Sequence, residues 1–235
     1  MKSLTKFLFA AVMLAGFNSA FAETQDRHLS GFHAISESGS FDIYITQGAT
    51  ESVRVEAPSD IINKIITEVS GDVLKIHEKS DHFNWGNIFN GGHKKIAVYI
   101  VVKDIHAISL SGSGDAFFKE GLSADRLELK TSGSGDMLGK VNVKTLETGI
   151  SGSGDIKLSG SAETSTISTN GSGDFSGRDL VTATTMVRIS GSGDASVNAT
   201  QKLDARVSGS GDIRYTGGAK QISSHSSGSG DIHRF

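Results

Sequence analysis

The chain has 235 residues, a formal net charge of −3, no cysteine, and 29 glycines against a single proline. Its acidic balance, without any basic cluster, argues against a nucleic-acid-binding protein. Without cysteine the fold has no disulfide and no lipid-bearing N-terminal cysteine, so a hydrophobic core must stabilise it, and the length is ample for one.

The N-terminal segment, residues 1–22, predicts a cleaved secretory signal peptide. Lys2 and Lys6 precede an apolar run, and the segment ends in Ala-Phe-Ala, the small-x-small pattern of a signal peptidase site. A retained anchor is the alternative, but the run is too short for a comfortable membrane span, and no later stretch predicts one. We expect an exported protein, periplasmic, at the cell surface or extracellular, with residues 23–235 forming a single domain.

The first part of the mature chain, residues 23–105, predicts irregular solenoid coils. "SGSFDIYI" (38–45) and "SGDVLKI" (70–76) are altered copies of a Ser-Gly-Ser-Gly-Asp phrase that recurs further along, with Phe41 replacing a glycine in the first copy. "SVRVEA" and "KKIAVYIVV" alternate apolar and polar residues, as strands do. We expect these coils to close one end of the core.

Two segments of this part depart from the strand pattern. "SDIINKIITE" (59–68) is the candidate helix, with its first serine or its aspartate as N-cap. Residues 80–95 are a predicted insertion that carries the only tryptophan. We interpret its aromatic residues as a cap over the open end of the core, or alternatively as a ligand or partner contact; they are Phe83, Trp85 and Phe89.

From residue 106 to 235 the sequence is built on one repeated pentapeptide. Ser-Gly-Ser-Gly-Asp begins at Ser111, Ser132, Ser151, Ser190, Ser208 and Ser227, and Asn-Gly-Ser-Gly-Asp begins at Asn170. Successive aspartates are 18–21 residues apart. A nearly fixed period of this length is typical of a solenoid, whereas a flexible linker would keep neither the period nor apolar residues in phase with it.

Apolar residues flank each pentapeptide with a period of two, which is the period of a strand. If Leu110 points inward, Gly112 and Gly114 also point inward, and the two serines and Asp115 point outward. Glycine weakens a strand unless the backbone must bend or approach closely, so each pentapeptide predicts a tight corner. The predicted fold is all-β, a single-stranded parallel β-helix (β-solenoid) with coils of about 19 residues. The corner residues are Gly112, Gly114, Asp115, Gly133, Gly135, Asp136, Gly152, Gly154, Asp155, Gly171, Gly173, Asp174, Gly191, Gly193, Asp194, Gly209, Gly211, Asp212, Gly228, Gly230 and Asp231.

The corner aspartates form a predicted ladder, because equivalent residues of stacked coils lie ~4.8 Å apart. Carboxylates at that spacing repel one another, so the ladder must be solvated, hydrogen-bonded by serine hydroxyls and turn N–H groups, or bridged by cations. Calcium prefers about six to eight oxygen ligands, and one carboxylate per coil supplies too few unless neighbouring coils share. We therefore expect no cofactor, with calcium as the alternative.

Four features together resemble the head GIN domain family of "putative auto-transporter adhesins". They are "GFHAISESGSFDIYITQGATESVRVEAP" (31–58), "IITEVSGDVLKI" (65–76), "KIAVYIVV" (95–102) and the serial pentapeptide. The resemblance covers the chain from about Phe32 to Ile232. It implies a right-handed parallel β-helix and an adhesive role at the cell surface, and it implies no catalytic residues.

The sequence favours an exported, non-enzymatic binding or structural module of the bacterial cell envelope, with an adhesin as the form that the resemblance implies. No serine lies in a Gly-x-Ser-x-Gly elbow, and no histidine pair has a zinc-ligand spacing. The alternative is a β-helix enzyme acting on envelope or extracellular polysaccharide, which needs a cleft with opposed carboxylates. A glycan or an envelope protein is the expected kind of partner, and a homo-oligomer stays open.

Overall fold

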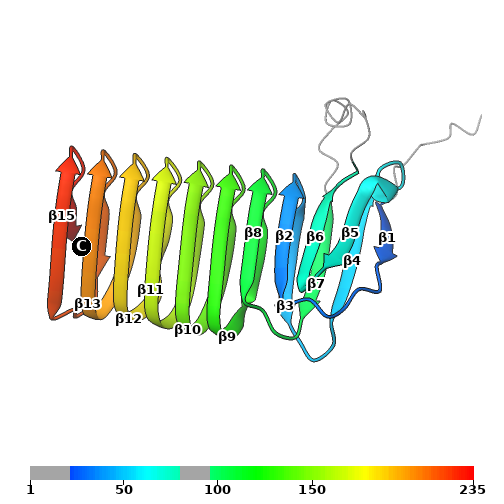
Figure 1. Ribbon diagram of the computed structural model, residues 1–235, viewed down its shortest axis with the longest axis horizontal. Helices are drawn as coiled ribbons and strands as arrows, with labels where there is room; N and C mark the ends of the chain where they lie inside the picture. Colours follow the sequence, from blue (N-terminus) through cyan, green and yellow to red (C-terminus); the bar gives the residue numbers. More distant parts are fainter. Residues whose placement is uncertain (1–21, 80–95) are drawn as a thin grey trace, which may run out of the picture.

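The computed structural model describes residues 22–79 and 96–235. In these ranges the chain winds into stacked parallel coils and contains no α-helix (Figure 1). The repeating register of the coils confirms the predicted β-solenoid.

The N-terminal part contains seven short strands. They are β1 (Ala22–Asp26), β2 (Ala34–Gly39), β3 (Asp42–Gln47), β4 (Ser52–Pro58), β5 (Ile65–Ser70), β6 (Val73–Glu78) and β7 (Ala97–Val102). The regular part begins with the short strand β8 (Ala107–Gly112) and continues with long strands that turn from one side of the solenoid to the other. The long strands are β9 (Ala116–Gly133), β10 (Met137–Gly152), β11 (Ile156–Gly171), β12 (Phe175–Gly191) and β13 (Ala195–Gly209), followed by β14 (Ile213–Thr216), β15 (Gln221–Gly228) and β16 (Ile232–Arg234).

Each coil crosses two faces of the solenoid. In β9, Phe117 pairs with Tyr44 of β3, whereas Leu129 pairs with Ile108 of β8, so one strand serves both faces. We call the face that carries β2, β8 and β15 the front face, because it faces the reader in Figure 1. The opposite face is the back face, and the pentapeptides turn the chain from front to back along the corner edge.

The coils differ in length, and the additional residues lie away from the corners. The parallel registers shift at Gly139/Val141, at Lys157/Ser159 and after Gly177, near the edge opposite the corner edge. At the corner edge the pairing runs without a shift to the first glycine of each pentapeptide, as in Gly133 with Gly152. The corners therefore set the register of the stack.

The interior is filled by residues of both faces at alternate positions. In β11, Ile156 and Leu158 of the back face and Ile167 and Thr169 of the front face are all buried. Buried side chains of this kind form one hydrophobic cluster along the described part of the chain, from Phe32 to Ile213. Burial of this apolar surface is the main stabilising contribution to the stack.

At the N-terminal end the coils do not follow chain order. The coil of β6 and β7 lies outside the coil of β2 and β3, because β6 pairs with β2 and β7 pairs with β3, while β2 also pairs with β8. Antiparallel strands then continue both faces: β5 pairs with β6, β4 with β7 and β1 with β4. The antiparallel strands and the short turn between β4 and β5 cover this end of the core, where Ile61 and Ile62 are buried.

Two predictions for this end are wrong. The candidate helix at 59–68 is a single 3₁₀ turn, Ile62–Lys64, without a side-chain N-cap, and it leads directly into β5. β-Branched residues such as Ile65 and Ile66 favour a strand once a partner strand is available, and β6 provides it. The "SGD" at 70–72 is the turn of the β5–β6 hairpin and not a solenoid corner, since Ser70 pairs with Val73.

The other altered copy, "SGSFDIYI", does occupy a corner. Ser38 and Gly39 pair with Ser111 and Gly112, so this coil is in register with the first complete pentapeptide. Phe41 takes the position of the second glycine and has no exposed surface.

Candidate functional site

The corner edge contains the residues that the repeat predicted, and alternate residues face in and out. In the corner that begins at Ser151, the serines at 151 and 153 are exposed, Gly152 is half-buried and Gly154 is buried. The aspartates of the seven corners are exposed or half-buried. The first glycine of each complete corner has a φ between 121° and 151°, a conformation that L side chains rarely adopt.

Glycine is required at the corners because neighbouring coils touch through their backbones. A Cβ on Gly152 would lie 2.3 Å from the carbonyl oxygen of Gly133, and one on Gly154 would lie 2.2 Å from that of Gly135. The same approach, at 2.0–2.3 Å, recurs at every pentapeptide glycine from Gly112 to Gly230. The crowding comes from the preceding coil, along the solenoid axis.

The aspartates form a ladder of hydrogen bonds to backbone N–H groups. The N–H of Asp155 donates to Oδ1 of Asp136 over 2.8 Å, and the N–H of Asp174 donates to Oδ1 of Asp155 over 2.8 Å. The same bond, at 2.7–2.9 Å, joins each successive pair from Asp115 to Asp231. The aspartate of each coil thus binds the backbone of the next coil. Of the alternatives that the sequence left open for the ladder, this is hydrogen bonding by the N–H groups of the turns. Over the described ranges no group of three His, Cys, Asp or Glu side chains is placed to bind a metal ion, and calcium binding stays an untested alternative.

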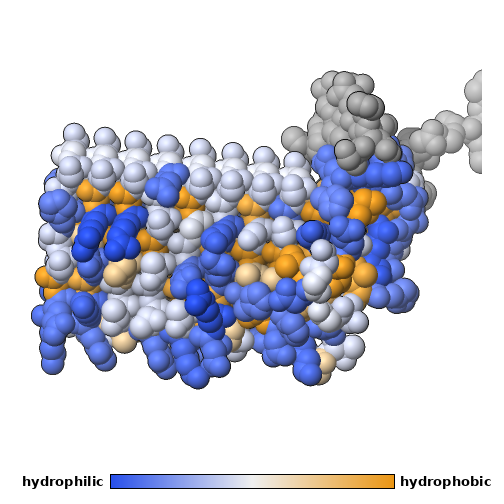
Figure 2. All heavy atoms as spheres, viewed as in Figure 1, coloured by the Kyte–Doolittle hydropathy of each residue, from blue (hydrophilic) through white to orange (hydrophobic). Residues whose placement is uncertain are grey.

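The serines of the pentapeptides form two exposed rows beside this ladder. One row, on the front face, contains Ser111, Ser132, Ser151, Ser190, Ser208 and Ser227, with Asn170 in the remaining place. The pale upper margin in Figure 2 is this edge of the molecule. The outward hydroxyls offer donors and acceptors at the same position in coil after coil.

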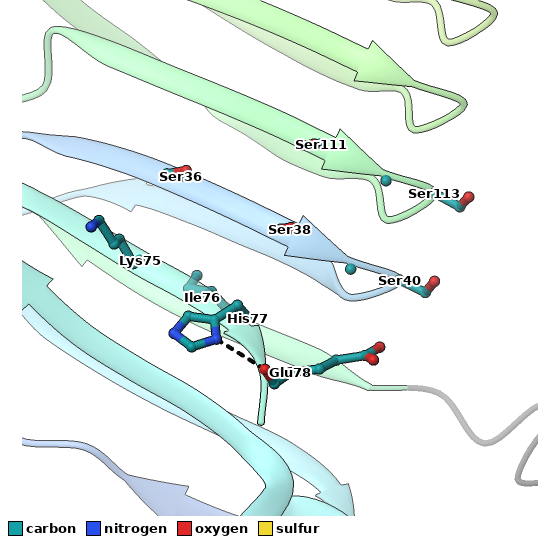
Figure 3. Close-up of a pocket in the computed structure, with 11 residues that line it drawn as sticks. Ser36, Ser38, Ser40, Lys75, Ile76, His77, Glu78, Ser111 and Ser113 are labelled. Atoms are coloured by element: carbon teal, nitrogen blue, oxygen red, sulfur yellow. Dashed lines mark hydrogen bonds between the residues drawn. The ribbon is translucent and has the colours of Figure 1, made fainter. Parts of the chain in front are cut away.

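A shallow groove of about 660 Å³ lies on the front face at the N-terminal end of the corner edge (Figure 3). Lys75 and His77 of β6 line it, opposite serines of β2 and β8. The ring Nδ1 of His77 lies 3.0 Å from the carbonyl oxygen of Glu78, and its Nε2 lies 3.8 Å from a Glu68 carboxylate oxygen. Burial raises the pKa of the Glu78 carboxyl. The predicted insertion follows β6 directly, but Phe83, Trp85 and Phe89 lie outside the described residues.

Glu37 is a buried carboxyl that the sequence reasoning missed. It occupies an inward position between Ile76 and Leu110 of the neighbouring coils and has no exposed surface. Burial raises its pKa to about 7, against an opposing hydrogen bond from the N–H of Phe41. The inward parity of Glu37 is visible in the sequence once it is aligned with Leu110.

Three aromatic side chains on the back face also escaped the sequence reasoning. The rings of Tyr44 and Tyr99 stack with centroids 5.2 Å apart, and those of Tyr44 and Phe117 stack at 5.1 Å. The guanidinium of Arg54 covers the Tyr99 ring at 4.9 Å, and the Lys119 ammonium lies 5.4 Å from the Phe117 centroid. Because the rings cover one another's faces, they stabilise the first coils and present edges, rather than faces, to solvent.

Comparison with known proteins assigns the solenoid to a family. A family model described as "putative auto-transporter adhesin, head GIN domain" matches residues 31–219. The chain belongs to this family. The matched residues include β2 to β14 and all but the last corner, and the resemblance predicted from the sequence is confirmed. No curated protein matches the chain.

Solved structures share the head GIN fold along nearly the whole chain. A "putative adhesin" from Bacteroides fragilis NCTC 9343 is 26% identical with a TM-score of 0.85, and the match covers 92% of this chain and 98% of that one. A "putative lipid binding protein" from Parabacteroides distasonis ATCC 8503 is 24% identical with a TM-score of 0.72 over the same shares, which shows a common fold alone. In the described part of this chain, no helix combines the length and the apolar character needed to cross a membrane.

Proposed function

We propose that this protein is an exported, non-enzymatic binding module of the bacterial cell envelope that acts as an adhesin. The observation that carries the proposal is the recurrence of equivalent outward side chains in successive coils, on a surface that has shallow grooves. Such a surface matches an extended, repeating ligand better than a single small molecule, which binds in a concave pocket that encloses it. The adhesin description of the family supports the same function.

Export is supported by the sequence of residues 1–22, which has the features of a cleaved signal peptide. An adhesin acts where it meets its ligand, so the cell surface or the medium is the proposed location. A glycan or an envelope protein is the proposed partner, and no cofactor is part of the proposal.

The non-enzymatic part of the proposal rests on the contacts and the burial of the corner carboxylates and of Glu37. The corner carboxylates accept hydrogen bonds from the backbone of the next coil. Glu37, whose pKa is raised to about 7, has no exposed surface with which to reach a substrate. A polysaccharide hydrolase or lyase needs catalytic groups that converge on the bond to be cleaved.

A binding screen with a cleavage assay tests the proposal. The purified protein is applied to an array of neutral and acidic glycans and to isolated envelope protein, and each signal is repeated in the presence of the soluble ligand as competitor. The bound glycans are then incubated with the protein and assayed for new reducing ends and unsaturated products. We expect competable binding without products; product formation that scales with protein concentration would identify an enzyme instead.

A further inference from the structure

A second groove lies on the front face towards the C-terminal end of the corner edge. It has a volume of about 420 Å³, and its walls include two parallel rows of side chains. We call it the cationic groove; its rows are Arg188, Arg206 and His225 on one side and Ser190, Ser208 and Ser227 on the other. In Figure 2 strongly hydrophilic side chains gather just below the pale upper margin at this end of the front face.

The two rows follow from the register of three coils. Arg188 of β12 pairs with Arg206 of β13, which pairs with His225 of β15, and the serines two residues later pair in the same way. Each coil therefore contributes one cationic or imidazole group and one hydroxyl, repeated at ~4.8 Å along the solenoid axis. The rows run along the axis, so the groove accommodates a linear ligand in that direction.

The protein balances only part of the positive charge of the groove. The Arg206 guanidinium pairs with Asp204, with Nε and Nη2 at 3.0 and 3.2 Å from the carboxylate oxygens. Arg188 forms no ion pair with any residue of the described ranges, and no acidic side chain lines the groove. Like charges directly opposite each other in a sheet are destabilising, so this pairing of arginines is unfavourable for folding alone. An anionic ligand placed on the row would offset that repulsion.

The side chains that line the groove favour a ligand with further chemical features besides negative charge. Guanidinium groups bind carboxylate or sulfate oxygens through paired N–H donors, and the serine row and Asn170 offer hydrogen bonds to hydroxyl groups. Ile189 and Val207 line the floor between the rows, but their side chains belong to the buried core. A linear ligand that combines spaced anions with many hydroxyls is an acidic polysaccharide.

We propose that the cationic groove binds an acidic polysaccharide chain along the solenoid axis, with its carboxylate or sulfate groups on Arg188 and Arg206. The proposal rests on the proposed adhesin function and names the ligand class for it. An acidic peptide supplies the charge without the hydroxyls, and an anionic lipid surface is too broad for a groove between two rows of side chains.

Binding of defined polymers tests the proposal. The purified protein is titrated by biolayer interferometry against immobilised polygalacturonate, dextran sulfate, neutral dextran, polyglutamate and anionic phospholipid vesicles at fixed salt. The test variant is R188Q/R206Q, and the control is K202Q/K220Q, which removes the same charge from two exposed lysines outside the groove. Melting curves verify that both variants are folded.

We expect at least one acidic polymer to bind, the groove variant to weaken its Kd at least 10-fold, and the control to weaken it less than 3-fold. Preference for polygalacturonate or for dextran sulfate identifies carboxylate or sulfate as the bound group. Equal losses in the two variants, or tighter binding of polyglutamate or of anionic vesicles, overturn the proposal. If neither acidic polymer binds but the array shows competable neutral glycans, this inference fails and the adhesin function stands. If no ligand binds in either experiment, both fail.

Discussion

Replacing single corner glycines by alanine separates two reasons for their presence, close backbone contact and backbone conformation. In Gly154→Ala the new Cβ would lie 2.2 Å from the carbonyl oxygen of Gly135, so the coils must move apart locally. Overpacking of this kind costs about 1–3 kcal/mol. Gly152→Ala adds backbone strain at a φ of 135° to a contact of 2.3 Å, and the combined cost is about 2–6 kcal/mol. Both substitutions also disturb the bond from the N–H of Ser153 to the carbonyl of Gly133, 2.8 Å long.

Two matched substitutions serve as controls. Gly71→Ala has a φ of 67° with nothing within 4 Å of the new Cβ, so it reports conformational strain alone, about 1–2 kcal/mol. Ser153→Ala removes an exposed hydroxyl beside both corner glycines and should change stability by less than about 0.5 kcal/mol. The free energy of unfolding is measured by urea titration and linear extrapolation. The reasoning is refuted if Gly154→Ala costs no more than Ser153→Ala, because contact between coils would then not require glycine.

Three further predictions concern buried or ladder-forming polar groups. The triple variant Asp155→Asn, Asp174→Asn, Asp194→Asn should keep its melting temperature within about 3 °C, because an amide oxygen still accepts the backbone N–H. Millimolar calcium should change the melting temperature of neither the original protein nor the variant. A calcium-dependent rise of about 5 °C that the triple variant loses would show a metal-bound ladder. The raised pKa of Glu37, about 7 against 4.5, means that the folded state holds its proton more tightly, so the Glu37 contribution to stability is greatest below pH 4.5 and falls by about 3 kcal/mol as the pH rises through 7. Glu37→Gln should remove that contribution in urea titrations at a series of pH values, and an unchanged pH dependence would exclude Glu37 as its source. Thr169→Val should raise stability by about 1 kcal/mol, because the buried Thr169 hydroxyl has no partner in the described structure. Thr131→Val should lower stability by about 1 kcal/mol, because the hydrogen bond from its hydroxyl to the Gly135 carbonyl is lost. Equal effects of the two substitutions in thermal melts would contradict this account.

The regular part of the fold could be predicted because each coil repeats the same short-range pattern. The period of two places Ile150 inward and Ser151 outward, and the recurrence of the pentapeptide sets the pairing of one coil with the next. The N-terminal end could not be predicted in the same way. That β6 lies outside β2, and not after β3, depends on which strand edges remain free, which is a property of the assembled sheet and not of the local sequence.

The candidate site was predictable in part. The repeat identified the corner residues, but it did not decide between hydrogen bonds and cations for the aspartates, because both are compatible with one carboxylate per coil. One row of the cationic groove could have been predicted from the sequence. Its members each stand two residues before the first serine of a pentapeptide; they are Arg188, Arg206 and His225. The aromatic stack was not, because Tyr44 and Tyr99 become neighbours only through the exchanged order of the first coils.

The close contact between coils also explains where function can vary. Inward positions and corner glycines are fixed by core packing and by backbone approach, so a substitution there damages the stack. Outward positions of the front face meet solvent and other outward side chains, as Arg206 meets Asp204 of its own strand. At one such position the side chains in successive coils are those of Ser109, Lys130, Gly149, Ser168, Arg188 and Arg206, so two arginines stand together only at the C-terminal end of the row. Core packing does not require that arrangement, and placing two arginines opposite each other is unfavourable. The proposed acidic ligand would offset that repulsion and so gives the arginine pair a physical reason.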